Sequence, residues 1–523
     1  GIGGYLAIAL GLTYPVLTDP STLVISQWPL DTDHVLWIQW WFARAIESPG
    51  LTLFQSDLIR YPDPANLQLA DINLAINAVA YLIAKPLGLI ASHNVMLWLS
   101  FVTSGWLMWE LGTRMSGDSL AGWLAGLVFA GSSYWVSCAL NSWAYLVHIW
   151  VFPLVFLAAV RATRRHGDAR YRARDFAWLG AAAGLTFHVS PYYFLFLAVL
   201  CTTLAPAYAR KTLALARAPG GLLCIAVAAA TTCAIVLPRA IPMYEASLGE
   251  FAVHSSSNPM ILASEALEFV LPVVNRPDRP EGGTFLVVFL GYTVPLVIAC
   301  GLWWTRRRAA YWCWLASAAA MFVLAIGPLW ESESGAVIRL PEYWLLQLPG
   351  FSFITNHWRW SLPGNFCLAV AFSLALADLF RAAPGRRRGI AAAAGLAFAI
   401  ESVLIFPFPW PRPRWPLPSD PVSHLLRGMD SVHAVLDFRR RAKINQLVHE
   451  KRIVGGWLPR VELSSVNATQ ALILGARENE GDPANYLGRL GIDAVVVNDR
   501  TAFQIVPVRG APGTFEQVPL RAR

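Results

Sequence analysis

The residues best suited to catalysis follow the first apolar segment of the chain. Asp31, Asp33 and His34 stand within four residues, and Asp63 comes later in the same polar stretch. Two carboxylates and an imidazole this close together can provide a general base, or ligands for a divalent cation. A structural alternative is that Asp31 or Asp33 caps an amphipathic helix over residues 34–47, whose tryptophans would lie at the level of the lipid headgroups.

A second group of polar side chains lies at the ends of apolar segments. His148 and His188 are at or near such ends, and Tyr192 follows at a Ser-Pro break. Polar and ionisable groups at these positions usually face a cavity rather than lipid. We interpret all three, together with Tyr61 of the first polar stretch, as candidates to contact a substrate. The alternative for each histidine is a hydrogen-bonded side chain that only packs.

A third group immediately precedes the apolar segment at 361–380. The stretch FSFITNHWRW contains His357 and Arg359. A guanidinium can bind a phosphate group through two parallel hydrogen bonds, so Arg359 is the candidate phosphate ligand, with His357 beside it. The alternative is a salt bridge to a lipid headgroup or within a loop. The sequence has no Gly-rich phosphate loop and no Walker-type lysine, which favours a lipid-carried substrate over a nucleotide.

The composition indicates what must position these groups. Of 523 residues, 56% are hydrophobic and 14% are charged, whereas a soluble domain carries roughly 25% charged residues. Segments long enough to cross about 30 Å of hydrocarbon recur along most of the chain, which excludes a soluble enzyme, a disordered tail and a collagen. These segments lie near residues 2–17, 93–113, 119–137, 145–161, 175–189, 191–208, 219–237, 285–303, 311–329, 361–380 and 390–406.

The basic residues predict the topology. Five short loops contain 17 of the 41 Lys and Arg residues, and the positive-inside rule makes these loops cytoplasmic. The result is about 11 transmembrane helices, with the N-terminus in the cytoplasm and the C-terminus outside. The ambiguous segment 72–90 then lies as a helix at the outer face. The net charge of +8 is a topology signal, so nucleic acid is excluded as a partner.

The predicted fold class is a mainly α, polytopic membrane protein with a small extracytoplasmic α/β domain at the C-terminus. Residues 1–406 form the transmembrane domain, and its long outer loops are 18–92, with interfacial helices, 238–284 and 330–360. Residues 407–418 form a Pro-rich linker that we expect to be extended. In the domain at 419–523, strands are predicted over 432–438, 492–497 and 503–508, and helices around 440–451 and 469–475.

The chain resembles the GT-C-type glycosyltransferases, in particular bacterial members with a periplasmic C-terminal domain. The resemblance covers nearly the whole chain in order, although each motif alone is weak. The motifs that carry it include Asp31-Thr-Asp33-His34, Tyr61-Pro62-Asp63, Ser190-Pro191-Tyr192-Tyr193, Leu348 to Trp360 (LPGFSFITNHWRW), Ile453 to Arg460 (IVGGWLPR) and Leu490 to Val497 (LGIDAVVV).

The resemblance implies transfer of a hexosyl or pentosyl group from a polyprenyl-phosphate sugar donor to an extracytoplasmic glycan, lipid or protein acceptor. It implies that Asp33 is the first candidate for the base, Asp31 the second and Asp63 an accessory acid. It also implies that Asp31 and Asp33 could hold a divalent metal ion, Mg or Mn, and that Arg359 holds the donor phosphate. The location implied is a bacterial inner membrane.

One stretch departs from the pattern of these relatives. Asn356, His357 and Trp358 stand where the relatives have an Arg-rich segment with an apolar residue or a proline. Two other classes remain open. A non-catalytic scaffold of the same architecture would assemble with other membrane subunits. A transporter or flippase would need acidic residues inside several spans and an internal repeat, and both signs are weak here.

Overall fold

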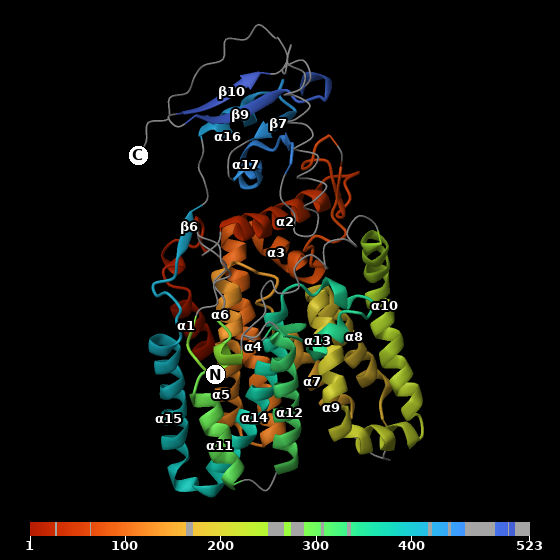
Figure 1. Ribbon diagram of the computed structural model, residues 1–523, viewed down its shortest axis with the longest axis vertical. Coiled ribbons are helices and arrows are strands. Elements are labelled where there is room, and N and C mark those ends of the chain that lie inside the picture. The colour runs from red at the N-terminus through yellow and green to blue at the C-terminus, as the bar shows by residue number, and fades with distance from the viewer. Residues whose placement is uncertain are drawn as a thin grey trace.

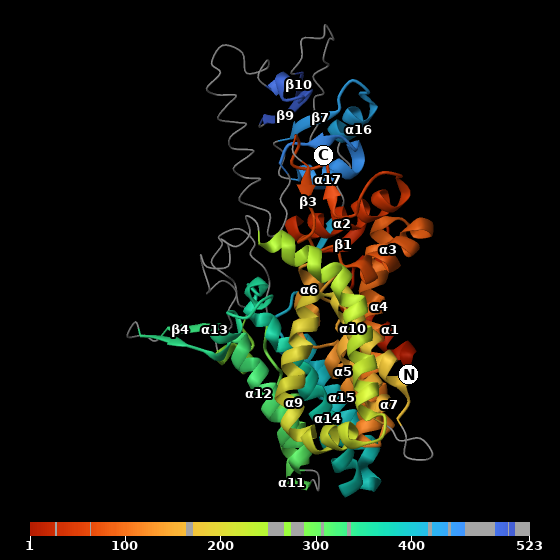
Figure 2. The ribbon, with the colours of Figure 1, turned by 90° about the vertical axis from the view of Figure 1, so that its right-hand side faces the viewer.

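The computed structural model consists of a helical bundle with a small domain stacked on one end (Figures 1 and 2). We call the end of the bundle that carries this domain the domain-side end, and the opposite end the far end. The residues that the structure describes are 1–26, 29–62, 64–163, 171–248, 266–273, 287–304, 308–331, 336–416, 421–437, 441–455, 487–499 and 502–507.

Each predicted apolar segment contains a helix. Among the described residues, 5 helical stretches are long and apolar enough to cross a membrane, so the chain is a multi-pass membrane protein. The bundle helices are α1 (Ile2–Leu12), α4 (Leu89–Ser116), α5 (Ser119–Ala130), α6 (Ser133–Leu140), α7 (Val151–Ala162), α8 (Ala173–Val189), α9 (Pro191–Arg217), α10 (Gly221–Ser247), α11 (Thr293–Trp304), α12 (Arg308–Ala325), α14 (Ser361–Ala382) and α15 (Arg387–Ile400).

Helix α14 lies at the centre of the bundle. Nearly all of its residues are buried, and it packs against α4, α5, α11 and α12. Small residues allow close helix packing, as is usual between membrane helices. At Gly301 of α11, an added Cβ would lie 2.4 Å from the Cβ of Ala375, so only glycine fits this crossing.

Two helices form a layer across the domain-side end, α2 (Pro29–Glu47) and α3 (Leu74–Leu87) (Figure 1). Helix α3 has 14 residues, fewer than the roughly 20 that a span needs. Helix α2 begins before Asp31, so Asp31 and Asp33 lie inside the helix and neither is its N-cap. Trp37 and Trp41 are fully buried in protein, which differs from the headgroup position considered for them.

The C-terminal domain is built on a four-stranded sheet in the order β10-β9-β7-β8, from β7 (Ala434–Asp437), β8 (Arg452–Ile453), β9 (Ala494–Asp499) and β10 (Ala502–Pro507). Strand β7 is parallel to β8 and β9, and β10 is antiparallel to β9. Helices α16 (Pro421–Gly428) and α17 (Ala442–His449) accompany the sheet. The predicted strands correspond to β7, β9 and β10, and the predicted helix at 469–475 lies outside the described residues.

The domain is joined to the first polar stretch by main-chain contacts. Ile59 pairs with Ile453 as a parallel bridge beside β8, and the Ile453 amide donates to the Leu58 carbonyl over 2.8 Å. The Pro-rich segment is docked along the bundle, since β6 (Arg414–Pro416) pairs with β1 (Leu23–Ile25). The Arg412 guanidinium also donates to the Leu12 carbonyl over 2.9 Å. The first polar stretch and the domain therefore form one unit.

Two short hairpins complete the described strands. Strands β2 (Gln55–Ser56) and β3 (Ala65–Asn66) pair within the first polar stretch. Strands β4 (Leu329–Glu331) and β5 (Val337–Arg339) form a hairpin that projects sideways from the bundle (Figure 2). It leads into α13 (Pro341–Leu345) and the 3₁₀ turn η5 (His357–Trp360), which precedes α14.

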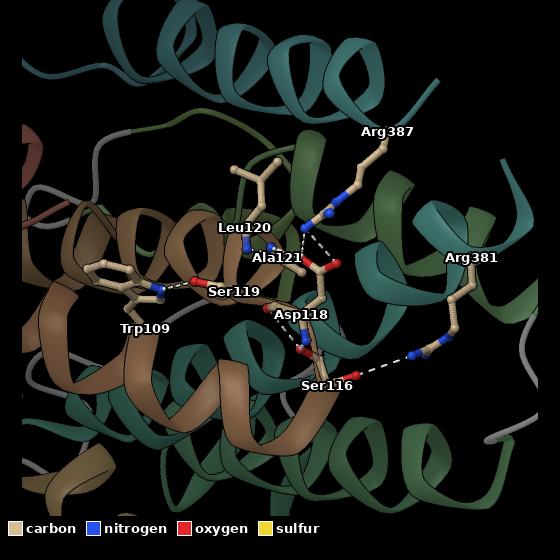
Figure 3. Close-up of polar contacts among 8 residues, drawn as sticks. All are labelled: Trp109, Ser116, Asp118, Ser119, Leu120, Ala121, Arg381 and Arg387. Atoms are coloured by element: carbon tan, nitrogen blue, oxygen red, sulfur yellow. Dashed lines mark hydrogen bonds and ion pairs between the residues drawn. The ribbon is translucent and has the colours of Figure 1, made fainter. Parts of the chain in front are cut away.

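The far end is held by exposed charges with local partners (Figure 3). Asp118 caps α5, because its Oδ1 accepts hydrogen bonds from the amides of Leu120 (2.9 Å) and Ala121 (3.0 Å). Arg387 pairs with the same carboxylate at 2.9 Å. Arg381 donates to the Ser116 carbonyl over 3.3 Å. These contacts tie the α4–α5 turn to the α14–α15 turn.

Candidate functional site

A cavity of about 260 Å³ opens at the domain-side end. It is bounded by the residues before α3, the α8–α9 junction, the last turns of α10 and the loop that precedes η5. Most of the lining is apolar, and its polar side chains belong to Asp71, Asn73, Tyr145, His188, Ser190, Tyr192, Arg239 and Tyr244. An apolar cavity with a few polar groups is typical of a small-molecule or lipid site. His188 and Tyr192, both predicted from the sequence to contact a substrate, therefore line one cavity.

Arg359 lies behind the Tyr192 wall of this cavity. Its guanidinium carbon is 4.9 Å from the centre of the Tyr192 ring and 5.7 Å from the centre of the Trp143 ring. The side chain is 4% exposed, and its Nε has no hydrogen-bond partner. A buried charged group usually has a partner, because desolvation is costly. Arg359 is therefore a buried cation with at least one donor atom, Nε, that no described residue accepts a hydrogen bond from.

The turn that carries Arg359 is held by a buried carboxylate. Glu342 of α13 is fully buried, and its Oε1 accepts a hydrogen bond from the Trp360 indole over 2.7 Å. Its Oε2 lies 2.8 Å from Nδ1 of His357, and burial raises the pKa of Glu342. His357 thus contacts Glu342 and helps to hold η5 in place. Arg359 lies in the same turn.

Asp31 connects to Arg359 through one indole ring. Its Oδ2 accepts a hydrogen bond from Trp143 Nε1 over 2.7 Å, and the same ring lies beside the Arg359 guanidinium. Burial raises the pKa of Asp31 to about 6, while Trp143 and Arg359 favour the ionised form. A carboxylate of this kind can exchange a proton close to neutral pH.

Asp33 is paired with the C-terminal domain. Arg441 binds it bidentately, with Nε donating to Oδ2 over 2.8 Å and Nη2 donating to Oδ1. Asp33 is 3% exposed, so this pair is buried. The structure therefore places Asp33, the first candidate from the sequence, against a guanidinium and not among the residues that line the cavity.

His34 joins a second basic residue of the domain to the cavity. The ammonium of Lys443 lies 2.7 Å from His34 Nδ1, and His34 Nε2 lies 3.7 Å from Asp71 Oδ2. Burial lowers the pKa of Lys443 to about 7, against the opposing effect of Asp33, Asp71 and Asp31. Asp71 also faces the cavity, so the chain of contacts runs from the domain to the cavity wall.

The other predicted residues lie elsewhere. Tyr61 packs in the domain, beside Leu436, Val454 and Ile492. His148 is buried and accepts a hydrogen bond from the Trp150 indole over 3.2 Å, and it is not among the residues that line the cavity. Asp63 lies outside the described residues. The structure thus brings Asp31, Arg359 and Tyr192 together and separates Tyr61 from them.

The residues around Asp31 and Asp33 do not fit a divalent metal ion. Among the described residues, no group of three or more His, Cys, Asp or Glu side chains is arranged to hold one. Both oxygens of Asp33 accept hydrogen bonds from Arg441, and Lys443 lies against His34 Nδ1. Divalent cations need several free oxygen or nitrogen ligands. Here both Asp33 oxygens and His34 Nδ1 are already in contact with basic side chains.

Three residues of this site were missed in the sequence analysis. Asp71 lies at the edge of an apolar segment and Lys443 in the C-terminal domain, so neither is near the other candidates in the sequence. Arg239 projects into the cavity from α10, where it contacts the Gln68 side chain and lies 3.9 Å from the centre of the Phe54 ring. A charged residue near the end of an apolar helix was the one signal that could have identified Arg239.

The comparisons with solved structures show the fold of this chain. No family model matches this chain, and no curated protein matches it. The apo structure of the Archaeoglobus fulgidus oligosaccharyltransferase matches 95% of this chain and 69% of its own, at a TM-score of 0.52 and 12% identity. A structure of the archaeal oligosaccharyltransferase AglB from the same organism contains an inhibitory peptide and a dolichol-phosphate. It matches 95% of this chain and 68% of its own, at a TM-score of 0.50 and 14% identity.

Proposed function

We propose, from the GT-C-type fold that this chain shares with those oligosaccharyltransferases, that it is a membrane glycosyltransferase. Its donor is a sugar carried on a polyprenyl phosphate, and its acceptor is a glycan, lipid or protein on the domain side of the membrane. One similar structure contains a dolichol-phosphate, which is a lipid phosphate of this chemical class.

One observation carries the proposal. Arg359 is buried, its Nε has no hydrogen-bond partner, and its guanidinium lies against Tyr192 in the wall of an apolar cavity. A lipid phosphate matches both features, because its chain suits the apolar lining and its phosphate suits a guanidinium. His188 and Arg239 line the same cavity, where His188 Nε2 lies 2.8 Å from the Ile235 carbonyl oxygen and Arg239 donates to Gln68.

Asp71 is the proposed general base. It is the carboxylate of this site that lines the cavity, and His34 lies beside it at 3.7 Å. In the reaction, Asp71 takes a proton from an acceptor hydroxyl or amine. The acceptor then attacks the anomeric carbon, and the bond from that carbon to the phosphate oxygen breaks. Arg359 stabilises the negative charge that develops on the leaving polyprenyl phosphate.

Asp31 and Asp33 have supporting roles in this proposal. Asp31 holds Trp143 and, through that ring, Arg359. Asp31 is also the second candidate for the base, because its pKa of about 6 suits proton transfer near neutral pH. Asp33, the first candidate from the sequence, positions the C-terminal domain through Arg441. No step passes through a metal ion.

The orientation follows from the basic residues. The α9–α10 and α14–α15 turns lie at the far end (Figure 1), and both carry Arg or Lys clusters. By the positive-inside rule, the far end faces the cytoplasm and the C-terminal domain lies outside. We place the protein in a bacterial inner membrane, with the N-terminus inside.

The test is lipid binding by the full chain in detergent. Undecaprenyl phosphate and undecaprenol serve as matched probes that differ only in the phosphate. We expect Arg359→Ala to weaken binding of the phosphate at least tenfold, as loss of a charged hydrogen bond worth about 1.5–3 kcal/mol requires. Binding of undecaprenol should stay unchanged. The control is Arg381→Ala, which removes an arginine at the far end.

Two results would count against the proposal. Equal binding of undecaprenyl phosphate by wild type and Arg359→Ala removes Arg359 from the phosphate site. A wild-type protein that does not distinguish the phosphate from the alcohol removes the lipid-phosphate donor and favours the non-catalytic scaffold.

A further inference from the structure

The acidic end of α2 is covered by two basic side chains from the C-terminal domain. Arg441 occupies both oxygens of Asp33, and Lys443 lies 2.7 Å from His34 Nδ1. Oδ2 of Asp31 accepts a hydrogen bond from Trp143. Four ligand atoms of the Asp-Thr-Asp-His stretch, namely both Asp33 oxygens, Asp31 Oδ2 and His34 Nδ1, are thus bound to protein groups.

Basic side chains also surround this site. Three carboxylates and three basic side chains interact across it: Asp31, Asp33 and Asp71 with Arg359, Arg441 and Lys443. A divalent cation in this place would add two positive charges beside these basic side chains in a buried region. Burying an uncompensated charge is costly, so the arrangement disfavours a resident metal ion.

The position of the two basic residues in α17 is informative. Arg441 precedes the first residue of α17, and Lys443 lies in its first turn. Basic groups at a helix N-terminus oppose the helix dipole and are unfavourable there by themselves. Their placement is explained by the carboxylates of α2, onto which α17 packs.

The domain is also docked by contacts outside the acidic cluster. Trp37 Nε1 donates to Gln446 Oε1 over 2.7 Å, and Arg44 pairs with Glu450 at 2.6 Å. Both contacts join α2 to α17 or to its C-terminal cap. They position Arg441 and Lys443 over the acidic end of α2, so the domain supplies part of the site.

We propose that Arg441 and Lys443 of the C-terminal domain provide the positive charge at the acidic end of α2 in place of a divalent cation. The domain therefore supplies positive charge beside the candidate site, and the reaction requires no metal ion. The statement about the reaction rests on the proposed function, whereas the statement about the charge does not.

The first experiment measures Mn²⁺ binding to the full chain at pH 7 by electron paramagnetic resonance. We expect no stoichiometric Mn²⁺ site in the wild-type protein, and we expect sugar transfer to be unchanged after EDTA treatment. The proposal is overturned by one bound Mn²⁺ that is lost in Asp33→Asn. It is also overturned if EDTA abolishes transfer and Mn²⁺ restores it.

The second experiment removes the two basic residues. In the double variant Arg441→Ala, Lys443→Ala, the carboxylates of α2 lose their protein partners, so we expect Mn²⁺ to bind at least tenfold more tightly than to the control. The matched control is Arg452→Ala, which removes another contact between the domain and the first polar stretch, the pair with Asp57 at 2.6 Å. Equal Mn²⁺ affinity in the two variants contradicts the proposal.

The two proposals fail in different ways. A wild-type protein that transfers no sugar but shows this pattern of Mn²⁺ affinities refutes the proposed function and keeps the role of Arg441 and Lys443. A wild-type protein that binds undecaprenyl phosphate through Arg359 and also requires Mn²⁺ for transfer keeps the proposed function and refutes the role of Arg441 and Lys443.

Discussion

The two ends of the bundle use the same residue types in opposite ways. At the far end, Asp118 caps a helix and pairs with Arg387, whose side chain is 46% exposed (Figure 3). At the domain-side end, Arg359 is 4% exposed and its Nε has no hydrogen-bond partner. An exposed pair is stabilised by water as well as by its partner. A buried cation with unused hydrogen bonds is costly, and binding an anion would offset that cost.

This difference separates structural charges from functional ones. The far-end groups complete helix ends and turns, so their loss should affect stability alone. The domain-side groups line a cavity, as Asp71 does, or lie behind its wall and contact one another, so their loss should affect ligand binding, transfer or docking of the domain. Substitutions at each end of the bundle test that distinction.

Asp71→Asn should lower the rate of sugar transfer by about 10²–10⁴-fold, because it removes the proposed general base. The measurement is transfer of labelled sugar from a polyprenyl-phosphate donor by the full chain. The far-end control Asp118→Asn keeps a capping side chain and should leave transfer unchanged. Full activity of Asp71→Asn, together with loss of activity in Asp31→Asn, would assign the base to Asp31.

Arg441→Ala should destabilise the protein by about 3 kcal/mol, because it leaves Asp33 buried without its counterion. Thermal unfolding in detergent gives the measurement. The matched variant Arg452→Ala breaks a pair whose side chains are both 43% exposed, and should cost less than about 1 kcal/mol. Similar losses in both variants would mean that burial does not distinguish the two pairs.

Asp31→Asn should stabilise the protein at neutral pH. The pKa of Asp31 is raised from 3.8 to about 6, so the folded protein binds the proton more tightly than the unfolded chain does. Ionisation therefore costs stability as the pH rises from about 4 to 6, and the full cost, up to about 3 kcal/mol, is present above pH 6. The amide can still accept the hydrogen bond from Trp143.

The measurement for Asp31 is the difference in unfolding free energy between variant and wild type at several pH values. The acidic and basic groups that act on Asp31 are Arg359, Asp71 and Lys443, and both proteins retain them. The advantage of Asp31→Asn should be absent near pH 4 and largest above pH 6. A difference that is constant with pH would contradict the shifted pKa.

Asp118→Ala should have the smallest effect, a loss of about 1–2 kcal/mol in stability with no change in transfer, because it removes the cap of α5. Thermal unfolding and the transfer assay on the same preparation check both parts. Reduced transfer per folded molecule would show that the far end also contributes to function.

The helical bundle and the candidate groups were predictable to different degrees. The apolar segments and three strands of the domain follow from local pattern, and the structure has a helix or strand at each. The prediction that 72–90 does not span followed from the topology set by the basic loops. Arg359 could be identified from the sequence because basic residues are scarce in the predicted outer loops. The partner of Asp33 could not be predicted, since Asp33 and Arg441 are 408 positions apart.

Hydropathy and charge distribution were sufficient for the membrane bundle, because transfer of apolar helices into lipid depends on the residues of each segment and little on the rest of the chain. The roles of the acidic residues depended on the fold. Asp31, Asp33 and Asp71 are chemically equivalent in the sequence. Packing of the C-terminal domain onto α2 pairs Asp33 with a guanidinium. Packing within the bundle sets Asp31 against the Trp143 indole and leaves Asp71 in the cavity wall. Burial and neighbouring charges determine what a carboxylate can do, and both arise from contacts between distant segments.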